Sequence, residues 1–335
     1  MRVFRAFLNI AAGVVLALAA IEAPQAQERR SISIVFPTSV TTFMLPYLVA
    51  QDQGWFKEHG LDIKEVYLNG DSNAARAIIS GSGDVALLGM QTLFDLAQAS
   101  AGLTTIVSWQ PIVDYHIVMK KALGKDLKAL VGKTLASGGP SDMTTEIPRM
   151  ILKKHGLDAN SVKFVQIGGH PARLQAVAGG KADATMINTL TALKGVRDGS
   201  VVIAQSIAKE FPNLGYGFVV VKAADLKDPA KRAAYMILVE GSILGARRVM
   251  KEPALAVEIL HKRLPDMDRG LIEEVVKELN ATNVWGVDGG LQPDVVTFTS
   301  DVSLSLNMVK RPIKPEEVYD PSLVNEVLKK VGPSK

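Results

Sequence analysis

The alternation of apolar and polar residues near the start of the chain predicts a strand–helix–strand unit. Two short apolar runs, 63–68 and 84–89, have the length and the flanking turn residues of buried strands. The segment between them has helical spacing up to Ile79, and Ser72 or Asn73 can cap its first turn through a side-chain oxygen. This order favours parallel strands that are joined by a right-handed crossover.

The same unit returns 96 residues later, which predicts two similar α/β lobes. His155-Gly156-Leu157-Asp158 repeats His59-Gly60-Leu61-Asp62, and a strand, a helix and a strand again follow, at 162–167, 171–178 and 184–187. Ligands of parallel α/β sheets bind outside the carboxyl ends of the strands, so two lobes that face each other across these ends would form a ligand cleft. Chance similarity between two generic units is the alternative interpretation.

The rest of the chain supplies further strands and helices to these lobes. Chain crossings near 112–119 and 214–222 would form a hinge between them. We therefore expect an α/β fold of two lobes, with residues 27–116 and 220–335 in the first lobe and 117–219 in the second. The C-terminal helices are expected to pack on the first lobe. Periodicity and turn residues predict further strands at 31–36, 104–109, 115–119, 134–136, 201–204 and 216–221, and helices at 43–53, 93–101, 144–155, 229–250, 253–264, 268–281, 293–310 and 321–331.

The first 26 residues have the order of a secretory signal peptide. Arg2 and Arg5 precede an apolar run, 10–21, and small and polar residues follow at 23–27. Twelve apolar residues are fewer than the roughly 20 that span a bilayer, although an N-terminal membrane anchor is the alternative. We expect cleavage between positions 20 and 27, and no later apolar run is long enough to cross a membrane.

The amino-acid composition limits the compartments in which the protein can act and the partners that it can bind. The chain has no cysteine, which excludes disulfides, thiolate metal sites and a lipid-carrying cysteine after the signal peptide. The mature protein is therefore expected to diffuse freely in a periplasm, as a monomer. Loss of Arg2, Arg5 and Glu22 with the signal peptide lowers the net charge from +4 to +3. This charge is too small and too dispersed to predict nucleic-acid binding.

The motifs of common catalytic sites are missing. The sequence has no G-x-S-x-G and no H-E-x-x-H, and its five histidines are isolated and without metal-ligand spacing. His59 and His155 match in the repeat and are expected to cap helices or lie on the surface, whereas His116 and His170 are candidates for ligand contact. No pair of carboxylates stands out as an acid–base couple. We expect a binding protein without a catalytic residue, a cofactor or a metal.

Three segments, 53–62, 77–86 and 179–184, carry a family resemblance. They resemble the periplasmic substrate-binding proteins of ABC transporters, in the class that binds nitrate, sulfonates, taurine and thiamine pyrimidines. The resemblance implies two α/β lobes with a hinge, and a small organic solute (a sulfonate, a carboxylate or a pyrimidine-like compound) in the cleft. It also implies delivery to a membrane permease that an ATPase drives. The branch that makes thiamine pyrimidine carries a cysteine-rich signature, which this chain lacks.

The loops that follow the predicted strands are the candidate ligand contacts. Helix starts near Ser72, Thr92, Ser141 and His170 can offer free N–H groups to an anion. The resemblance carries over positions rather than residue identities. These positions are Thr38, Ser39, Thr41, Thr42, Gly70, Asp71, Met90, Gln91, Thr92, Gln110, Ser137, Gly139, Ser141, Asp142, His170 and Asn188.

The charged residues near these loops leave the charge of the ligand open. Asp71 and Asp142 can accept a hydrogen bond from an amine or a ring N–H, or they can cap helices. Arg76 and Arg173 lie inside the repeated helices, where solvated faces are favoured over an anion-binding role. An exported enzyme or a ligand-sensing domain on the same scaffold is the alternative function.

Overall fold

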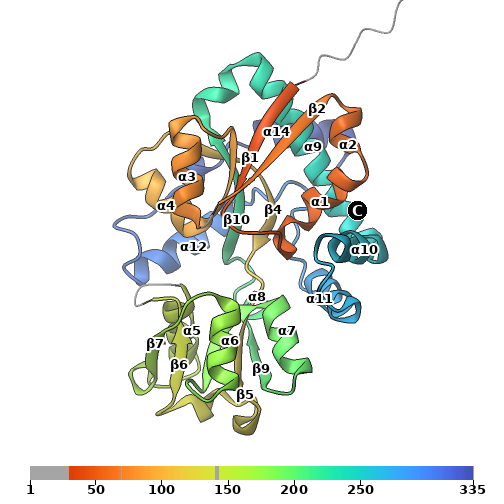
Figure 1. The fold of residues 1–335 in the computed structure, drawn as a ribbon. Coiled ribbons are helices and arrows are strands. Elements are labelled where there is room, and N and C mark those ends of the chain that lie inside the picture. Colours follow the sequence, from red (N-terminus) through yellow and green to blue (C-terminus); the bar gives the residue numbers. More distant parts are fainter. Residues whose placement is uncertain (1–29, 69, 140–142, 335) are drawn as a thin grey trace, which may run out of the picture.

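The computed structural model describes residues 30–68, 70–139 and 143–334. Two mixed sheets form two lobes, one above the other in Figure 1, with helices on the faces of each sheet. The expected two-lobed α/β fold is therefore confirmed. The proposed signal peptide, 1–26, lies outside the described residues. In the part that is described, no helix is both long enough and apolar enough to cross a membrane.

The first sheet has the strand order β2-β1-β3-β10-β4. Strand β1 pairs in parallel with β2 and β3, and β10 pairs antiparallel with β3 and β4. The return crossing therefore supplies the antiparallel strand. The bounds are β1 (Arg30–Phe36), β2 (Leu61–Tyr67), β3 (Val85–Gly89), β4 (Leu103–Ile112) and β10 (Gly215–Lys222).

The second sheet repeats this topology, in the order β7-β6-β8-β5-β9. Strand β6 pairs in parallel with β7 and β8, and the crossing strand β5 pairs antiparallel with β8 and β9. Each lobe thus receives its antiparallel strand from a chain crossing. The bounds are β5 (Tyr115–Lys120), β6 (Thr134–Ser137), β7 (Lys163–Gln166), β8 (Ala184–Asn188) and β9 (Val201–Ser206).

The helices follow the predicted order, with some boundaries changed. The expected helix 43–53 is split into a 3-10 turn and α1, and α12 ends at Ser305, earlier than expected. The α-helices are α1 (Leu45–Asp52), α2 (Trp55–Glu58), α3 (Asp71–Ser80), α4 (Met90–Gln98), α5 (Met143–Lys154), α6 (His170–Ala178), α7 (Thr189–Arg197), α8 (Ile207–Glu210), α9 (Pro229–Lys251), α10 (Pro253–Arg263), α11 (Arg269–Ala281), α12 (Pro293–Ser305), α13 (Pro315–Val318) and α14 (Ser322–Val331). The 3-10 segments are Thr42–Met44, Lys121–Leu123, Leu127–Leu130, Ala159–Ser161 and Ala223–Lys227.

The repeated glycine–aspartate turns make equivalent hydrogen bonds to the first strand of each lobe. Gly81 and Gly180 have φ angles of +82° and +80°, which a residue with a side chain rarely adopts. Asp84 then accepts a hydrogen bond at 2.8 Å from the backbone N–H of Ser33 in β1. Asp183 accepts the equivalent bond in β6, at 3.0 Å from Thr134 N. Each turn therefore ties its helix to the first strand of the lobe.

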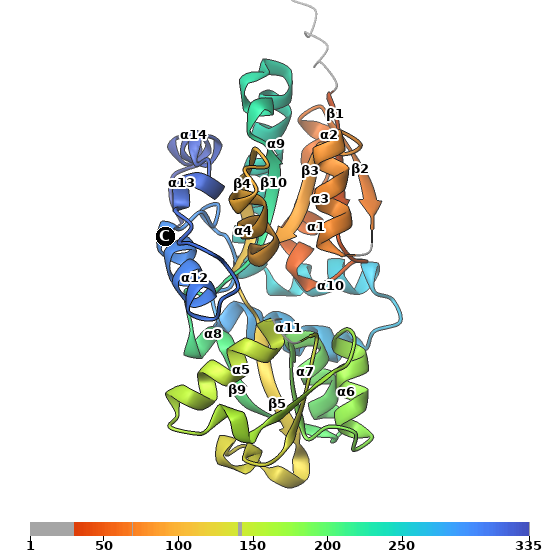
Figure 2. The ribbon, with the colours of Figure 1, turned by 90° about the vertical axis from the view of Figure 1, so that its left-hand side faces the viewer.

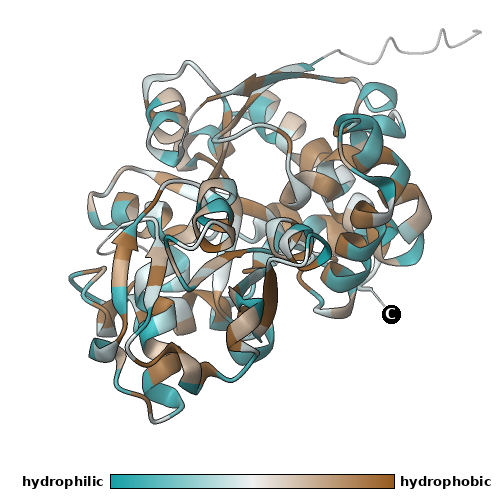
Figure 3. Ribbon diagram, turned by 60° about the horizontal axis from the view of Figure 1, so that its bottom comes forward, coloured by the Kyte–Doolittle hydropathy of each residue, from teal (hydrophilic) through white to brown (hydrophobic). Residues whose placement is uncertain are grey.

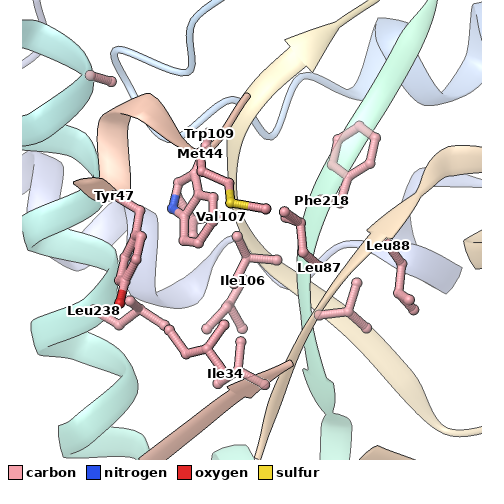
Figure 4. Packing of buried hydrophobic residues seen from close by; sticks show 14 of the residues in the cluster. Ile34, Met44, Tyr47, Leu87, Leu88, Ile106, Val107, Trp109, Phe218 and Leu238 are labelled. Atoms are coloured by element: carbon pink, nitrogen blue, oxygen red, sulfur yellow. The ribbon is translucent and has the colours of Figure 1, made fainter. Parts of the chain in front are cut away.

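The largest core lies in the first lobe. Tyr47, Trp109 and Phe36 pack face to face or tilted, with ring centroids 5.0–6.2 Å apart, and Trp109 Nε1 donates to Ser242 Oγ at 2.8 Å. Figure 4 shows the rings of Tyr47 and Trp109 between α9 and the sheet. In Figure 3 the strands are largely hydrophobic, whereas hydrophilic colour marks the outer faces of many helices. Burial of these side chains supplies the main driving force for each lobe.

The C-terminal helices join both lobes, which corrects the expectation that they pack on the first lobe alone. Helices α9, α10 and α14 do belong to the first core. However, α11 packs against α7 of the second lobe, and Phe298 of α12 contacts Phe211 with ring centroids 6.0 Å apart. Figures 1 and 2 show α11 next to the second lobe. Ion pairs of Arg197 with Asp268 and of Lys209 with Glu278 also link the lobes.

Two chain crossings connect the sheets directly. The first runs between β4 and β5, and the second between α8 and β10. They are adjacent, because Val113 N donates to Leu214 O at 3.1 Å. Since β5 begins at Tyr115 and β10 at Gly215, we propose hinge segments at 113–114 and 211–214, slightly before the lobe boundaries expected from the sequence.

Candidate functional site

A cleft of about 680 Å³ lies between the lobes, at the carboxyl ends of β1, β3 and β8. This is the place where the sequence analysis expected a ligand, and the volume is within the range of small-molecule sites. Both lobes contribute to it. The lining residues are Pro37, Thr38, Thr41, Phe43, Gly70, Asp71, Leu87, Leu88, Gly89, Met90, Gln91, Thr92, Tyr115, Met143, Thr144, Gly169, His170, Arg173, Asn188, Tyr216, Gly217 and Met308.

The cleft brings together many of the predicted ligand contacts, although their contact with a ligand stays a prediction. Predicted residues in its lining are Thr38, Thr41, Gly70, Asp71, Met90, Gln91, Thr92, His170 and Asn188. Predicted residues that are not part of the lining are Ser39, Thr42, Gln110, Ser137 and Gly139. Ser141 and Asp142 lie outside the described residues.

Four of the five predicted residues outside the lining support the walls, whereas Ser39 is exposed. Thr42, Gln110 and Ser137 are buried, and Gln110 Nε2 donates to Ile112 O at 3.2 Å. Gly139 O accepts a hydrogen bond at 2.6 Å from Thr145 Oγ1 in α5. These contacts hold the end of β4 in place and tie Gly139 to α5.

Asp71 is the charged residue on the wall of the first lobe. Its Oδ2 accepts a hydrogen bond at 2.7 Å from the N–H of Gly89, where β3 ends. Burial raises the pKa of the Asp71 carboxyl, and hydrogen bonds from Gly89 and Thr92 oppose this shift. The side chain caps no helix: Gly70 is the N-cap residue of α3, and neither Ser72 nor Asn73 fills that position. The predicted N-cap at Ser72 or Asn73 is therefore wrong, because α3 already begins at Asp71.

Arg173 is the charged residue on the wall of the second lobe, and the interpretation as a solvated residue is wrong. Its side chain is buried, with Nη1 donating to Gly168 O at 2.7 Å and Nη2 to Met186 O at 3.4 Å. By contrast, Arg76 of α3 is exposed and bonds to Asn73. The carbonyl oxygens of Gly168 and Met186 therefore hold the Arg173 guanidinium from within the second lobe.

The misassignment of Arg173 arises from the register of the repeat. The letters Ala75-Arg76 and Ala172-Arg173 match at an offset of 97 residues. The flanking strands β3 and β8 match at an offset of 99, and so do the buried positions of α3 and α6. Arg173 is therefore the structural equivalent of the buried Ala74. The loops before the two helices, 68–70 and 167–169, have the same length, so the letter match at an offset of 97 does not follow the structural register.

His170 connects Arg173 to the floor of the cleft. Arg173 Nη2 lies 3.2 Å and Asn188 N 3.3 Å from His170 Nδ1. Both neighbours are donors, so Nδ1 is the acceptor and the ring proton sits on Nε2.

An aromatic row, formed by Phe43, Tyr216, Tyr115 and His170, lines the cleft across the hinge. Successive ring centroids are 5.8, 5.5 and 5.0 Å apart, and all three pairs meet edge to face. Every member is half-buried and belongs to the cleft lining. Of these four residues, His170 alone was predicted from the sequence to contact the ligand. Tyr115 and Tyr216 were missed, and their place at the start of the predicted crossing strands 115–119 and 216–221 was the signal in the sequence that could have found them.

A buried polar cluster lies behind the aromatic row. Thr189 Oγ1 donates to Asp114 O at 2.7 Å and accepts from His116 Nε2 at 2.9 Å. Burial raises the pKa of Asp114 and lowers the pKa of His116 to about 4. His116, a candidate for ligand contact, is therefore a neutral hinge residue and does not line the cleft. Among the described residues, no group of three or more His, Cys, Asp or Glu side chains is placed to hold a metal ion.

A family model described as NMT1/THI5 like matches residues 41–227, more than half of the chain. The chain belongs to the NMT1/THI5-like family. The matched residues include both crossings and most of the cleft lining. This result agrees with the resemblance found in the sequence.

Solved structures similar to this NMT1/THI5-like chain are named as binding proteins. The ligand-binding component of an ABC-type import system from Staphylococcus aureus, with zinc bound, has a TM-score of 0.72 at 12% identity, covering 89% of this chain and 99% of its own. The nitrate-binding protein NrtA from Synechocystis PCC 6803 has 0.71 at 12%, covering 91% and 90%. The alkanesulfonate-binding protein SsuA from Xanthomonas axonopodis pv. citri, bound to MOPS, has 0.67 at 17%, covering 88% and 100%. These matches establish the periplasmic-binding-protein fold.

A curated relative matches a shorter segment of the NMT1/THI5-like chain. YtlA of Bacillus subtilis, which is named as a candidate binding protein, is 23% identical over 150 residues. The match spans 44% of this chain and about half, 45%, of the length of YtlA.

Proposed function

We propose that this NMT1/THI5-like protein is the solute-binding component of an ABC importer. It holds a small organic solute between its lobes in the periplasm and delivers it, as a monomer, to a membrane permease driven by an ATPase. The observation that carries the proposal is the cleft itself. It lies at the carboxyl ends of strands from both lobes, and hydroxyl, amide and aromatic side chains line it.

The chemistry of the lining supports binding rather than turnover. Hydroxyl and amide groups such as Thr38, Thr41, Gln91 and Asn188 can donate and accept hydrogen bonds without changing charge. We propose that the lining residues predicted from the sequence are ligand contacts. The similar proteins that are named for nitrate and alkanesulfonate binding support a solute of comparable size.

Thermal unfolding of the mature protein tests this proposal. The panel contains sulfonates, carboxylates, pyrimidines and nitrate. A ligand at a hundred times its Kd stabilises the folded state by about 2.7 kcal/mol, which raises Tm by roughly 5 °C. The proposal fails if no solute raises Tm, or if the protein converts a solute into product.

A matched pair of variants tests whether the cleft is the binding site. Thr38 and Ser39 are adjacent and exposed, but Thr38 alone lines the cleft. Thr38→Trp should fill part of the cleft and abolish the ligand-dependent rise in Tm, whereas Ser39→Trp should retain it. Equal responses of the two variants would place the ligand elsewhere.

A further inference from the structure

The two walls of the cleft carry opposite charges. Among the described lining residues, the carboxylate and guanidinium side chains are Asp71 in the first lobe and Arg173 in the second, and His170 lies next to Arg173. Neither side chain depends on the ligand for its position. Gly89 N holds the carboxylate, and Gly168 O and Met186 O hold the guanidinium.

The aromatic row runs from one charge to the other. On the side of the first lobe, a Cβ on Gly89 would lie 3.0 Å from Asp71 Oδ2 and 3.8 Å from the backbone oxygen of Tyr216, the second member of the row, so Asp71 and Tyr216 are neighbours. At the other end, the ring of His170 contacts both Tyr115 and Arg173. Asp71 and Arg173 therefore lie beside opposite sides of the part of the row formed by Tyr216, Tyr115 and His170.

We propose that the ligand is an aromatic solute with an anionic group at one end and an N–H donor at the other. Arg173 binds the anionic group, Asp71 accepts from the N–H donor, and the aromatic row contacts the ring. The inference rests on the proposed function and specifies the class of solute. Each lobe recognises one end of the ligand, so a complete ligand holds the two lobes together.

The chemistry of the two side chains supports these roles. A guanidinium is planar and matches the paired oxygens of a sulfonate or carboxylate. A carboxylate has about four acceptor sites, and at Asp71 hydrogen bonds come from Gly89 N and the Thr92 side chain. An amine on the ligand can therefore donate to Asp71 without displacing Gly89. Water exclusion inside the cleft strengthens both contacts.

A matched set of probes tests the inference by titration calorimetry on the mature protein. Sulfanilate carries the ring, the sulfonate and the amine. In p-toluenesulfonate a methyl group replaces the amine, in p-toluidine a methyl group replaces the sulfonate, and taurine keeps both polar groups without the ring. We expect sulfanilate to bind at least tenfold more tightly than each of the other three.

Two variants with matched controls assign the ends of the ligand. Asp71→Asn should lower the preference for sulfanilate over p-toluenesulfonate at least fivefold, and Arg173→Gln should weaken both sulfonates at least tenfold. The exposed residues Asp62 and Arg76 supply the controls Asp62→Asn and Arg76→Gln, which should change neither value. The preference is a ratio measured on one variant, so a general loss of stability does not alter it.

The outcomes separate this inference from the proposed function. Equal affinity for sulfanilate and p-toluenesulfonate, or an unchanged preference in Asp71→Asn, overturns the inference. Failure of all four probes also overturns it, while binding of another solute from the thermal panel leaves the proposed function standing. Failure of the entire panel overturns both.

Discussion

Replacement of Thr189 by valine tests the buried polar cluster at the hinge. Thr189 begins α7 and its side chain is buried next to the first crossing. Its hydroxyl both donates to the carbonyl of Asp114 and accepts from the ring of His116. Valine has nearly the same shape but no hydroxyl, so the change removes two hydrogen bonds and leaves the packing almost unaltered.

The expected cost follows from the two partners that remain. The Nε2–H group of His116 and the carbonyl oxygen of Asp114 both lose this hydrogen bond in a buried site, and each loss costs about 1–3 kcal/mol. We expect Thr189→Val to lower the free energy of unfolding by about 2–4 kcal/mol. The backbone N–H of Thr189 keeps its bond to Asp114 Oδ2, so the start of α7 should remain in place.

Denaturant unfolding with a matched control measures this cost. Thr185 in β8 is also fully buried, and its hydroxyl donates a single bond, at 2.8 Å, to Ala136 O. Thr185→Val is the same chemical change in the same lobe, and we expect it to cost about 1 kcal/mol. If Thr189→Val costs no more than Thr185→Val, the hydroxyl does not stabilise the hinge and the reasoning is refuted.

Three further predictions concern pH and packing. Folding lowers the pKa of His116 from 6.5 to about 4, so between these pH values the unfolded chain binds the proton and the folded protein does not. The free energy of unfolding should therefore be highest above pH 6.5 and lower by about 3 kcal/mol at pH 4. In urea unfolding at a series of pH values, His116→Gln should remove this dependence. The Thr134 N–H and Lys120 lower the pKa of Asp183, so the carboxylate stabilises the fold at neutral pH and this stabilisation is lost as the pH falls through the lowered pKa. Asp183→Asn should therefore lower the free energy of unfolding by about 1 kcal/mol at pH 7 and by less at pH 3. The exposed control Asp198→Asn should show neither effect. A Cβ at Gly245 would lie 2.0 Å from Pro46 O, so Gly245→Ala should lower stability by about 1–3 kcal/mol, whereas Gly195→Ala meets only methyl groups and should lower Tm less.

The sequence predicted the architecture because each lobe is built from local patterns. Short apolar runs and glycine–aspartate turns fixed the strands, and the repeat fixed the second lobe. The strand-end loops then placed Asp71, Gln91 and Asn188 at the cleft, because parallel strands of one sheet end at one edge. These are consequences of chain order, which a sequence displays directly.

The rest of the site depends on information that the sequence does not display. Tyr115 and Tyr216 belong to crossing strands, and a register shift of one residue would turn each ring to the other face of its sheet. The burial of Arg173 was not predicted because the strands and helices of the repeat match at an offset of 99 residues, whereas the letters Ala-Arg match at an offset of 97. Likewise, α11 and α12 contact the second lobe through tertiary packing that their own amphipathic patterns do not specify.

The contacts between the lobes differ with their distance from the hinge, and this difference is suited to closure around a solute. Near the crossings lie the buried Thr189 cluster, which joins α7 to the first crossing, and the packing of the buried Phe211 on the half-buried Phe298. Helix α7 leads from Thr189 to Arg197, about 12 Å away at 1.5 Å per residue. At that end the contact with α11 is an exposed ion pair with Asp268, of the kind that salt screens. We propose that the buried contacts define the axis of lobe movement, while the exposed ion pair exchanges its partners with water. On this proposal, closure is governed by what fills the cleft.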